Sequence, residues 1–304
     1  MRTPSSGSGT LLSPWGLSES RQERLRGGML NENCRVWTKA GQFVLKMYRY
    51  RDARQVAFEQ KMLRCLADRR FPCPRVVATQ DGRTLLEREG KVMALYTYLP
   101  GKTGQAFELR DLRRVGFLLG RLHRVLRREK QTVTKDRWEP RDVARLLRTE
   151  SRQILQKRFP GARTHLPYLA QEYTRLRFPK TLPTGITHQD IKPDNIVFDG
   201  RRISFIDFDN MYRGVLLFDA MTPVIWMCFR GSVFSPEAFR AYCRGYESAR
   251  PFTQLEKTYL HDALRFRLLR ESFAWAMRFN TARAHRVHAQ MFRRYLAVRD
   301  ICDI

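Results

Sequence analysis

The chain lacks any long hydrophobic run. None of its apolar segments approaches the ~20 residues that a helix needs to cross a bilayer, although 43% of its 304 residues are hydrophobic and 12% are aromatic. The first residues, MRTPSSGSGTLLSPWG, also lack the apolar core of about 7–15 residues that marks a secretory signal. These absences predict a cytoplasmic globular protein without a membrane span.

Cysteine is sparse and scattered along the chain. The six cysteines stand at positions 34, 65, 73, 228, 243 and 302, with neither a C-x-x-C pair nor the spacing of a zinc site. We therefore expect no disulfide framework and no metal centre built from cysteine.

Acidic residues are few beside the basic ones. The 30 Asp and Glu residues stand against 57 Lys and Arg, which gives a formal net charge of +27 at pH 7. Such a charge attracts polyanions, but no nucleic-acid-binding motif accompanies it. We interpret it as mainly solvated surface, and we expect any nucleic-acid binding to be weak and non-specific. The charge disfavours a polycationic substrate, and no pattern indicates the oligomeric state.

The character of the sequence changes at the dipeptide Pro100-Gly101, a natural hinge. Before it, short apolar and alternating runs predict one helix at 52–67 and strands at 25–30, 34–38, 42–48, 84–88 and 92–98. After it, helical periodicity predicts helices at 109–127, 140–157, 168–176, 236–247, 254–279 and 281–298. The fold class we expect is α+β. The expected parts are a disordered, Ser-, Gly- and Pro-rich tail over 1–20, a small β-rich lobe over 21–99 and a larger, mainly helical lobe over 100–304.

The segment GITHQDIKPDNIVFDGRRISFIDFD, residues 185–209, carries the most specific chemical signal. Asp199-Gly200 between apolar residues is a turn signal that joins two short strands, 195–198 and 203–206. Antiparallel pairing brings Asn195 beside Asp207, because neighbouring strands lie about 5 Å apart. Their oxygens suit a hard cation such as Mg2+, and Asp190 on the preceding loop can face an incoming hydroxyl. The plainer alternative is an ordinary hairpin with exposed acids.

The spacing H-x-D-x-x-x-x-N, followed by two hydrophobic residues and Asp, is that of kinase catalytic and metal-binding loops. The segment resembles the aminoglycoside phosphotransferase and choline kinase superfamily, whose members have a bilobal protein-kinase-like fold. Within it the chain is most similar to type II homoserine kinases and spore-coat kinase-like proteins, through FPCPRVVATQDGRTL, LLFDAMTPVIWMC and GYESARPFT. The resemblance runs from about Gly27 to Phe279. It implies transfer of the γ-phosphoryl group of ATP, with Mg2+, to the hydroxyl of a small molecule such as homoserine, an amino alcohol or a sugar.

Lys46 and Glu59 form a second candidate pair. Lys46 lies in the middle of an alternating strand, and Glu59 interrupts an apolar helical stripe, where an unpaired carboxylate is costly. A strand lysine paired with a helix glutamate orients the α- and β-phosphates in kinase-like folds. The alternatives are an exposed strand lysine and a glutamate at the edge of the stripe.

The remaining nucleotide contacts are less marked. No G-x-G-x-x-G motif occurs, and Gly28 with the segment up to Asn33 takes the place of the phosphate-covering loop, unless it forms a plain hairpin turn. Adenine is expected at the hinge, where Tyr98 lies.

Three further residues follow from the resemblance. His188 corresponds to a histidine that supports the catalytic loop, and Asp219 to an aspartate that braces this loop through backbone hydrogen bonds. Lys192 departs from homoserine kinases and matches protein serine/threonine kinases, in which this lysine contacts the transferring phosphate. His123 is expected to be structural.

Several alternatives stay open at this point. Protein phosphorylation is the enzymatic alternative, although Asp209 stands where a D-F-G motif has glycine. From another class come a catalytically silent kinase fold and a basic nucleic-acid-binding protein. Residues that line the acceptor pocket are not identifiable; Tyr212, Trp226 and Arg267 are candidates, each with ordinary packing or a solvated face as the simpler interpretation.

Overall fold

The structure is a computed structural model that describes residues 11–25, 31–104, 106–131, 133, 138–156 and 162–301. The chain divides into two compact units. Unit 1 contains the N-terminal part up to Gly104, a short piece around Val133, and Asp194–Met211; unit 2 contains the rest. The split falls close to the expected hinge, but the hairpin that we placed in the helical lobe belongs to the sheet-containing unit.

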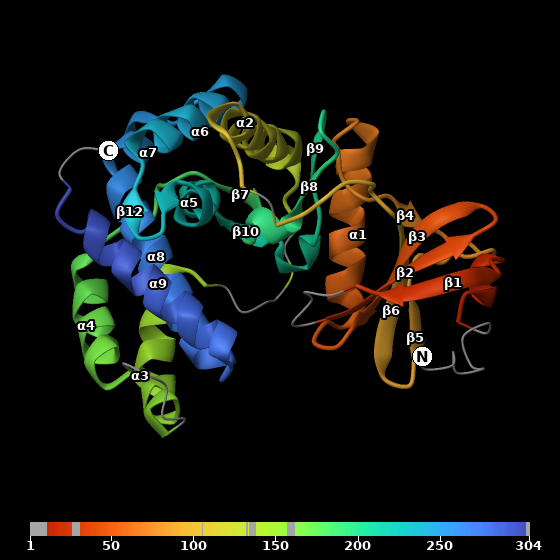
Figure 1. Cartoon of the computed structure of the whole chain (residues 1–304), viewed down its shortest axis with the longest axis horizontal. Coiled ribbons are helices and arrows are strands. Elements are labelled where there is room, and N and C mark those ends of the chain that lie inside the picture. Colours follow the sequence, from red (N-terminus) through yellow and green to blue (C-terminus); the bar gives the residue numbers. More distant parts are fainter. Residues whose placement is uncertain are drawn as a thin grey trace. The chain divides into compact units, whose positions relative to one another are not determined.

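Unit 1 contains an antiparallel sheet and one long helix (Figure 1). Its sheet has the order β1-β2-β3-β6-β4, with β5 also paired to β6, and all of these pairs are antiparallel. The elements are η1 (Ser13–Trp15), β1 (Glu19–Arg24), β2 (Asn31–Thr38), β3 (Gly41–Tyr48), α1 (Ala53–Asp68), β4 (Val76–Val77), β5 (Leu86–Arg88), β6 (Lys91–Thr97), β8 (Ile196–Phe198), β9 (Ile203–Phe205) and η4 (Phe208–Asn210).

Helix α1 begins where its sequence provides a cap. The Asp52 side chain accepts a hydrogen bond from the backbone N–H of Gln55 at 2.8 Å, and the Gln55 side chain accepts one from the Asp52 backbone N–H. This capping box satisfies two of the amide donors that a helix start leaves open. Glu59 is thereby placed one and a half turns into the helix, on its buried face.

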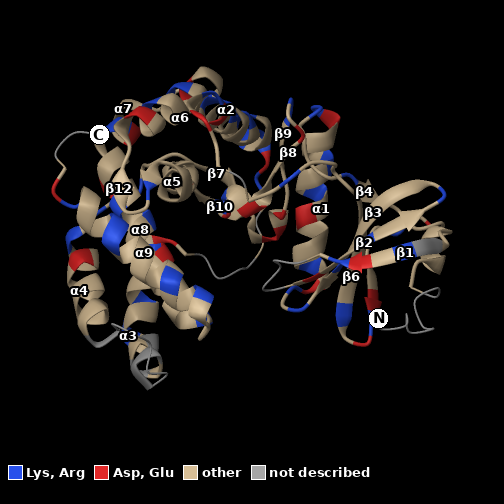
Figure 2. Ribbon diagram, in the orientation of Figure 1, with Lys and Arg blue, Asp and Glu red and all other residues tan. Residues whose placement is uncertain are grey.

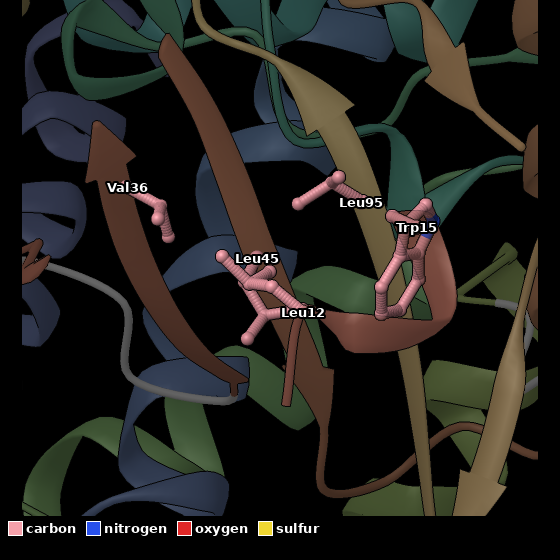
Figure 3. Packing of buried hydrophobic residues seen from close by; sticks show 5 residues of the cluster. All are labelled: Leu12, Trp15, Val36, Leu45 and Leu95. Carbon is pink, nitrogen blue, oxygen red and sulfur yellow. The ribbon is translucent and has the colours of Figure 1, made fainter. Parts of the chain in front are cut away.

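The predicted disordered tail is wrong from Leu11 onward; residues 1–10 lie outside the described part. Leu12 and Trp15 are buried against Val36, Leu45 and Leu95 of the sheet, as Figure 3 shows. The Trp15 indole N–H also donates to the Val77 carbonyl at 3.1 Å. The Ser, Gly and Pro content therefore misled the prediction, because two apolar side chains are enough to anchor this segment on the sheet.

Unit 2 is mainly helical, and its described residues also form two short antiparallel strand pairs (Figure 1). The elements are α2 (Leu109–Val125), η2 (Leu126–Arg128), α3 (Pro140–Gln156), α4 (Ala162–Arg175), β7 (Thr184–Thr187), β10 (Tyr212–Val215), α5 (Leu216–Met227), β11 (Phe229–Arg230), β12 (Val233–Phe234), α6 (Pro236–Ala249), α7 (Gln254–Thr258), α8 (Leu260–Arg278) and α9 (Ala282–Val298). A short 3-10 turn, η3 (Pro193–Asn195), spans the boundary between the units.

Glycines allow two helices of unit 2 to pack very closely. A Cβ added to Gly120 of α2 would lie 2.6 Å from the Tyr246 carbonyl oxygen of α6, and one added to Gly245 of α6 would collide with the Arg113 carbonyl oxygen. The backbones therefore approach more closely than larger residues permit. This packing fixes α6 against α2, which also carries His123.

Helix α5 lies inside unit 2, with ten of its twelve residues buried. It places Asp219 in a fully buried position in its first turn. None of the described helices is both long and apolar enough to span a bilayer.

Candidate active site

The predicted hairpin is present in unit 1. Strands β8 and β9 pair antiparallel with Ile196 opposite Phe205, and the backbone N–H of Ile206 donates to the Asn195 carbonyl at 3.0 Å. The turn follows its sequence signal, since the Asp199 carboxylate accepts from the backbone N–H of Arg202 at 2.6 Å and Gly200 has φ +91°. Asn195 and Asp207 therefore flank the same end of the hairpin, as the turn position requires.

Lys46 reaches the end of this hairpin from strand β3. Its Nζ lies 2.9 Å from Oδ1 of Asp207, and its side chain is only 7% exposed. Glu59 Oε1 and Asp209 Oδ2 each lie 3.7 Å from the same nitrogen. Burial alone would lower the pKa of Lys46, but the three surrounding carboxylates outweigh it and raise the pKa well above its ordinary value. The ammonium is therefore charged at any physiological pH.

Glu59 is fixed in place by a tyrosine. Tyr48 lies two residues after Lys46, on the same face of β3. Its hydroxyl donates a hydrogen bond to Glu59 Oε2 at 2.9 Å. Its oxygen lies 2.7 Å from that of Tyr96 on β6. Burial, followed by the Glu59 charge, raises the pKa of Tyr48 well above its ordinary value, so it remains a donor. The Lys46–Glu59 pair that the sequence predicts is thus present, with a supporting partner that it did not reveal.

Asp207 has an unusual backbone conformation. Its φ of +64° lies in the left-handed region, which a non-glycine residue seldom adopts. The preceding hairpin strand and the following turn η4 hold it there, and its side chain keeps 35% of its surface exposed. Strained residues held in this way cluster at ligand-binding positions, which agrees with the expected metal-binding role.

Asp209 and Asn31 belong to the same cluster, and sequence reasoning gave neither a firm role. Asn31 Nδ2 donates to Asp209 Oδ2 at 2.5 Å, and both side chains are buried. For Asp209, the available signal was its position as the second aspartate of the Asp-Phe-Asp sequence.

The donor set suits Mg2+. Asp207 and Asp209 offer carboxylate oxygens and Asn195 an amide oxygen, which are the ligands that this hard cation prefers. In the part of the chain that the structure describes, no three His, Cys, Asp or Glu side chains gather into a metal cage. This is compatible with Mg2+, which proteins commonly hold through one or two carboxylates together with substrate phosphates and water.

The other nucleotide candidates fall in different surroundings. Gly28 lies outside the described residues. Asn33 lies in strand β2, directly opposite Lys46 of strand β3. The expected phosphate-covering loop is therefore a strand at this residue. Its carboxamide oxygen is buried and has no described hydrogen-bond donor. Tyr98 immediately follows β6, and its ring lies 3.9 Å from the guanidinium carbon of Arg35; its adenine-binding role stays a prediction.

The residues predicted to form the catalytic loop lie in unit 2. Lys192 Nζ lies 2.7 Å from both carboxylate oxygens of Asp190, and each side chain is 19% exposed. The backbone N–H of Asp190 points to Nδ1 of His188 at 3.4 Å. Asp190 is thus a partly accessible carboxylate, held by a cation two residues away.

Asp219 holds the loop that carries Asp190. Its carboxylate oxygens accept from the backbone N–H groups of His188 at 2.7 Å and Gln189 at 2.6 Å. His123 lies behind it, with Nε2 2.9 Å from Asp219 and Nδ1 2.7 Å from the Tyr246 hydroxyl. Burial alone would raise the pKa of Asp219, but these histidine and backbone contacts hold it below its ordinary value. The buried carboxylate therefore stays ionised and positions the loop.

The comparisons with known proteins agree with this arrangement. Residues 21–252 match the model of the phosphotransferase enzyme family, APH. A homoserine kinase of Brucella anthropi is 30% identical over 275 residues, which cover 86% of this chain and 79% of that protein.

Two solved structures share the fold at low identity. An amicoumacin kinase, hAmiN, in complex with AMP-PNP, Ca2+ and Ami superposes with a TM-score of 0.70 at 15% identity, over 93% of this chain and 89% of that one. A microcompartment-associated aminopropanol kinase gives 0.67 at 17% identity, over 95% and 94%. The sheet and helices therefore form the kinase-like fold that the hairpin predicted, and the chain belongs to the phosphotransferase enzyme family.

Proposed function

We propose that the protein transfers the γ-phosphoryl group of ATP to the hydroxyl of a small molecule, with homoserine-like compounds, amino alcohols and sugars as the acceptors to test. The observation that carries this proposal is the buried Lys46 beside Glu59 and Asp207. A buried ammonium with a helix glutamate and a hairpin carboxylate is the kinase arrangement for phosphate and metal. The 30% identity to a homoserine kinase supports homoserine as the first acceptor.

The proposed roles divide between the residues around Lys46 and the loop that carries Asp190. Asp190 would orient the acceptor hydroxyl and accept its proton, because it is the accessible carboxylate of the braced loop. As the acceptor oxygen bonds to phosphorus, the bond between phosphorus and the ADP oxygen breaks. Lys46 and Lys192 would offset the negative charge on the phosphates. Asp207, Asn195 and Asp209 would hold Mg2+, which when bound would offset negative charge on the phosphates.

Protein phosphorylation remains the alternative with a specific observation in its favour. The segment from Lys192 through Asn195 matches the protein-kinase pattern in sequence. Against it, Asp209 replaces the flexible glycine of a D-F-G motif and is buried beside Lys46 and Asn31. An ion-paired, buried aspartate leaves less freedom for the loop movements that activate protein kinases.

ADP release in the presence of Mg2+ tests the proposal. The full chain is incubated with ATP and a panel that contains L-homoserine, L-serine, choline, ethanolamine and simple sugars. We expect at least one small hydroxyl compound to raise ADP release well above the rate with ATP alone. No stimulation by any panel member, with phosphorylation of a protein substrate instead, would favour the alternative.

A further inference from the structure

Gln189, the residue directly before Asp190, accepts hydrogen bonds from two buried arginines. Its side-chain oxygen lies 2.7 Å from Nη1 of Arg270 and 3.4 Å from Nη1 of Arg267. Both arginines belong to helix α8; Arg267 is fully buried and Arg270 is 7% exposed. Charged side chains are rarely buried without a matching anion. Here the acceptor shared by the two cations is a neutral amide.

The same cluster holds buried donors that have no acceptor within the described part of the chain. They are Nε and Nη2 of Arg267, Nε of Arg270 and Nε2 of Gln189. The ring centre of Trp138 lies 5.8 Å from the Arg270 guanidinium carbon. The indole N–H of Trp138 is also buried and has no described acceptor. An unsatisfied buried donor destabilises the folded state, so this many in one place points to a ligand rich in acceptor oxygens.

The acids that face the cluster do not satisfy it. Glu271 forms an ion pair with Arg267, but its oxygen lies 3.7 Å from Nη2, so it leaves the hydrogen-bond donors of this guanidinium unsatisfied. Glu139 is attracted electrostatically by Arg270, but its Oε1 accepts from the Tyr212 hydroxyl at 3.1 Å and the Val215 backbone N–H at 3.4 Å. Burial raises the pKa of Glu139, which weakens it further as a counter-charge.

We propose that Arg270, Arg267 and Gln189 form a subsite for a carboxylate of the phosphate acceptor. A carboxylate has two oxygens with about four acceptor positions and pairs with the planar guanidinium fork. In this arrangement it takes over the arginine hydrogen bonds that the Gln189 oxygen now accepts, and Gln189 Nε2 donates to it. The inference rests on the proposed function and specifies it: the acceptor is a hydroxy acid or amino hydroxy acid, not an amino alcohol.

The position of Gln189 gives this subsite its relevance to catalysis. Gln189 and Asp190 are consecutive, so their Cα atoms lie about 3.8 Å apart, and Asp219 anchors the Gln189 backbone N–H at 2.6 Å. A carboxylate bound at Gln189 therefore brings a hydroxyl a few bonds away close to the Asp190 carboxylate. The left-handed φ of Gln189, +70°, is a second sign of a backbone held for function.

Two matched pairs of acceptors test the subsite without any mutation. L-homoserine and 3-aminopropan-1-ol differ only by the carboxylate, as do L-serine and ethanolamine. With the full wild-type chain and Mg-ATP, we expect kcat/KM for the better amino acid to exceed that for its decarboxylated partner by about 100-fold or more, since a buried polar site rejects ligands that leave it unpaired. Equal values for both members of each pair would overturn the inference while the phosphotransferase proposal stands.

Variants assign the effect to the arginines. Arg270→Met should raise the KM for the amino acid by about 100-fold, leave the KM for ATP within about twofold, and bring the ratio between paired acceptors towards one. Arg278→Met is the matched control, because this exposed arginine lies on the same helix and also faces Trp138, at 4.5 Å. An unchanged ratio in Arg270→Met would contradict the subsite.

A binding measurement covers the case in which Arg270→Met does not fold. The melting temperature of the wild-type chain should rise with L-homoserine, or with L-serine, and not with the decarboxylated partner at the same concentration. Equal shifts would overturn the inference. If no panel compound supports ADP release at all, the proposed function fails first, and the two failures are thereby distinguished.

Discussion

At the scale of single residues, Asp190 is expected to control chemistry and not nucleotide affinity. Asp190→Asn keeps the shape of the side chain but removes the proton acceptor, so turnover should fall by about 10²–10⁴-fold. Mg-ATP affinity should stay within a few-fold of wild type. Steady-state ADP release and nucleotide titration measure the two quantities separately.

The matched control is Asp194→Asn, the same change at an exposed position four residues later in the chain. It should retain wild-type turnover. Undiminished turnover in Asp190→Asn would remove this residue from the proposed role.

Asp207 should behave differently, because its proposed role is to bind the metal and it also lies beside Lys46. Asp207→Ala deletes a metal ligand and the carboxylate 2.9 Å from Lys46, so nucleotide affinity and turnover should fall together. Nucleotide binding should also become insensitive to Mg2+, which titrations with and without the metal detect. The control is Asp199→Ala, in the turn of the same hairpin. Tight, Mg2+-dependent binding by Asp207→Ala would contradict the role assigned to the hairpin.

At the scale of secondary-structure elements, a histidine joins three helices of unit 2 and makes their packing depend on pH. His288 of α9 has Nε2 2.8 Å from Nδ1 of His165 on α4, and Nδ1 2.9 Å from Oγ of Ser272 on α8. Burial, helped by the neighbouring His165 and His285 and opposed by the Ser272 backbone hydrogen bond, lowers the pKa of His288 from 6.5 to about 4. The folded state thus favours the neutral ring.

The sign of the pH effect follows from that shift. The folded pKa of His288 lies below the unfolded one, so its contribution is present above about pH 6.5 and is lost as the pH falls towards 4. Between pH 7 and 4 the wild type should lose about 3 kcal/mol more unfolding free energy than His288→Gln. Denaturant titrations at several pH values measure this difference. His285→Gln, on the same helix and partly exposed, should follow the wild type; parallel curves for His288→Gln would refute the explanation.

At the scale of the whole molecule, the property to be tested is the net charge of +27. Figure 2 shows Lys and Arg on helices and strands of both units, with no single element carrying them all. Charges spread in this way are screened within a Debye length, about 10 Å at 0.1 M salt. Turnover of a small neutral or zwitterionic acceptor should therefore change little between about 50 and 200 mM salt.

Binding to RNA provides the contrasting measurement. A protein that neutralises about 6–10 phosphates loses roughly 10³–10⁵ in affinity over that salt range, so we expect weak RNA binding that disappears with salt while ADP release persists. Tight RNA binding at 200 mM salt, without turnover of any small hydroxyl compound, would instead favour a basic nucleic-acid-binding protein. Preferred phosphorylation of a cationic aminoglycoside would leave the phosphotransferase proposal intact and refute our use of the charge.

Local patterns were enough to predict much of this protein from its sequence. The Asp199-Gly200 turn and the alternation around Lys46 each act over a few residues, so the hairpin and strand β3 were predicted with boundaries close to those observed. The helix predicted at 52–67 likewise lies within one residue of α1 at both ends. Helix α5 was missed, because a helix buried on all sides has no amphipathic period. Residues 254–279 were predicted as one helix, and the structure divides them at Tyr259 into α7 and α8.

Contacts between distant segments were decided by the tertiary structure alone. Asn31 reaches Asp209 across 178 positions, and Arg270 reaches Gln189 across 81, so no local pattern could pair them. The sequence placed Leu12 and Trp15 in a polar tail, whereas in the folded chain the apolar surface of the sheet buries them. The sequence alone indicated which residues to propose for phosphotransfer chemistry, since that depends on residue type and short spacing. The groups that neutralise and orient those residues, and the space around them, depend on burial. Burial exists only in the folded chain.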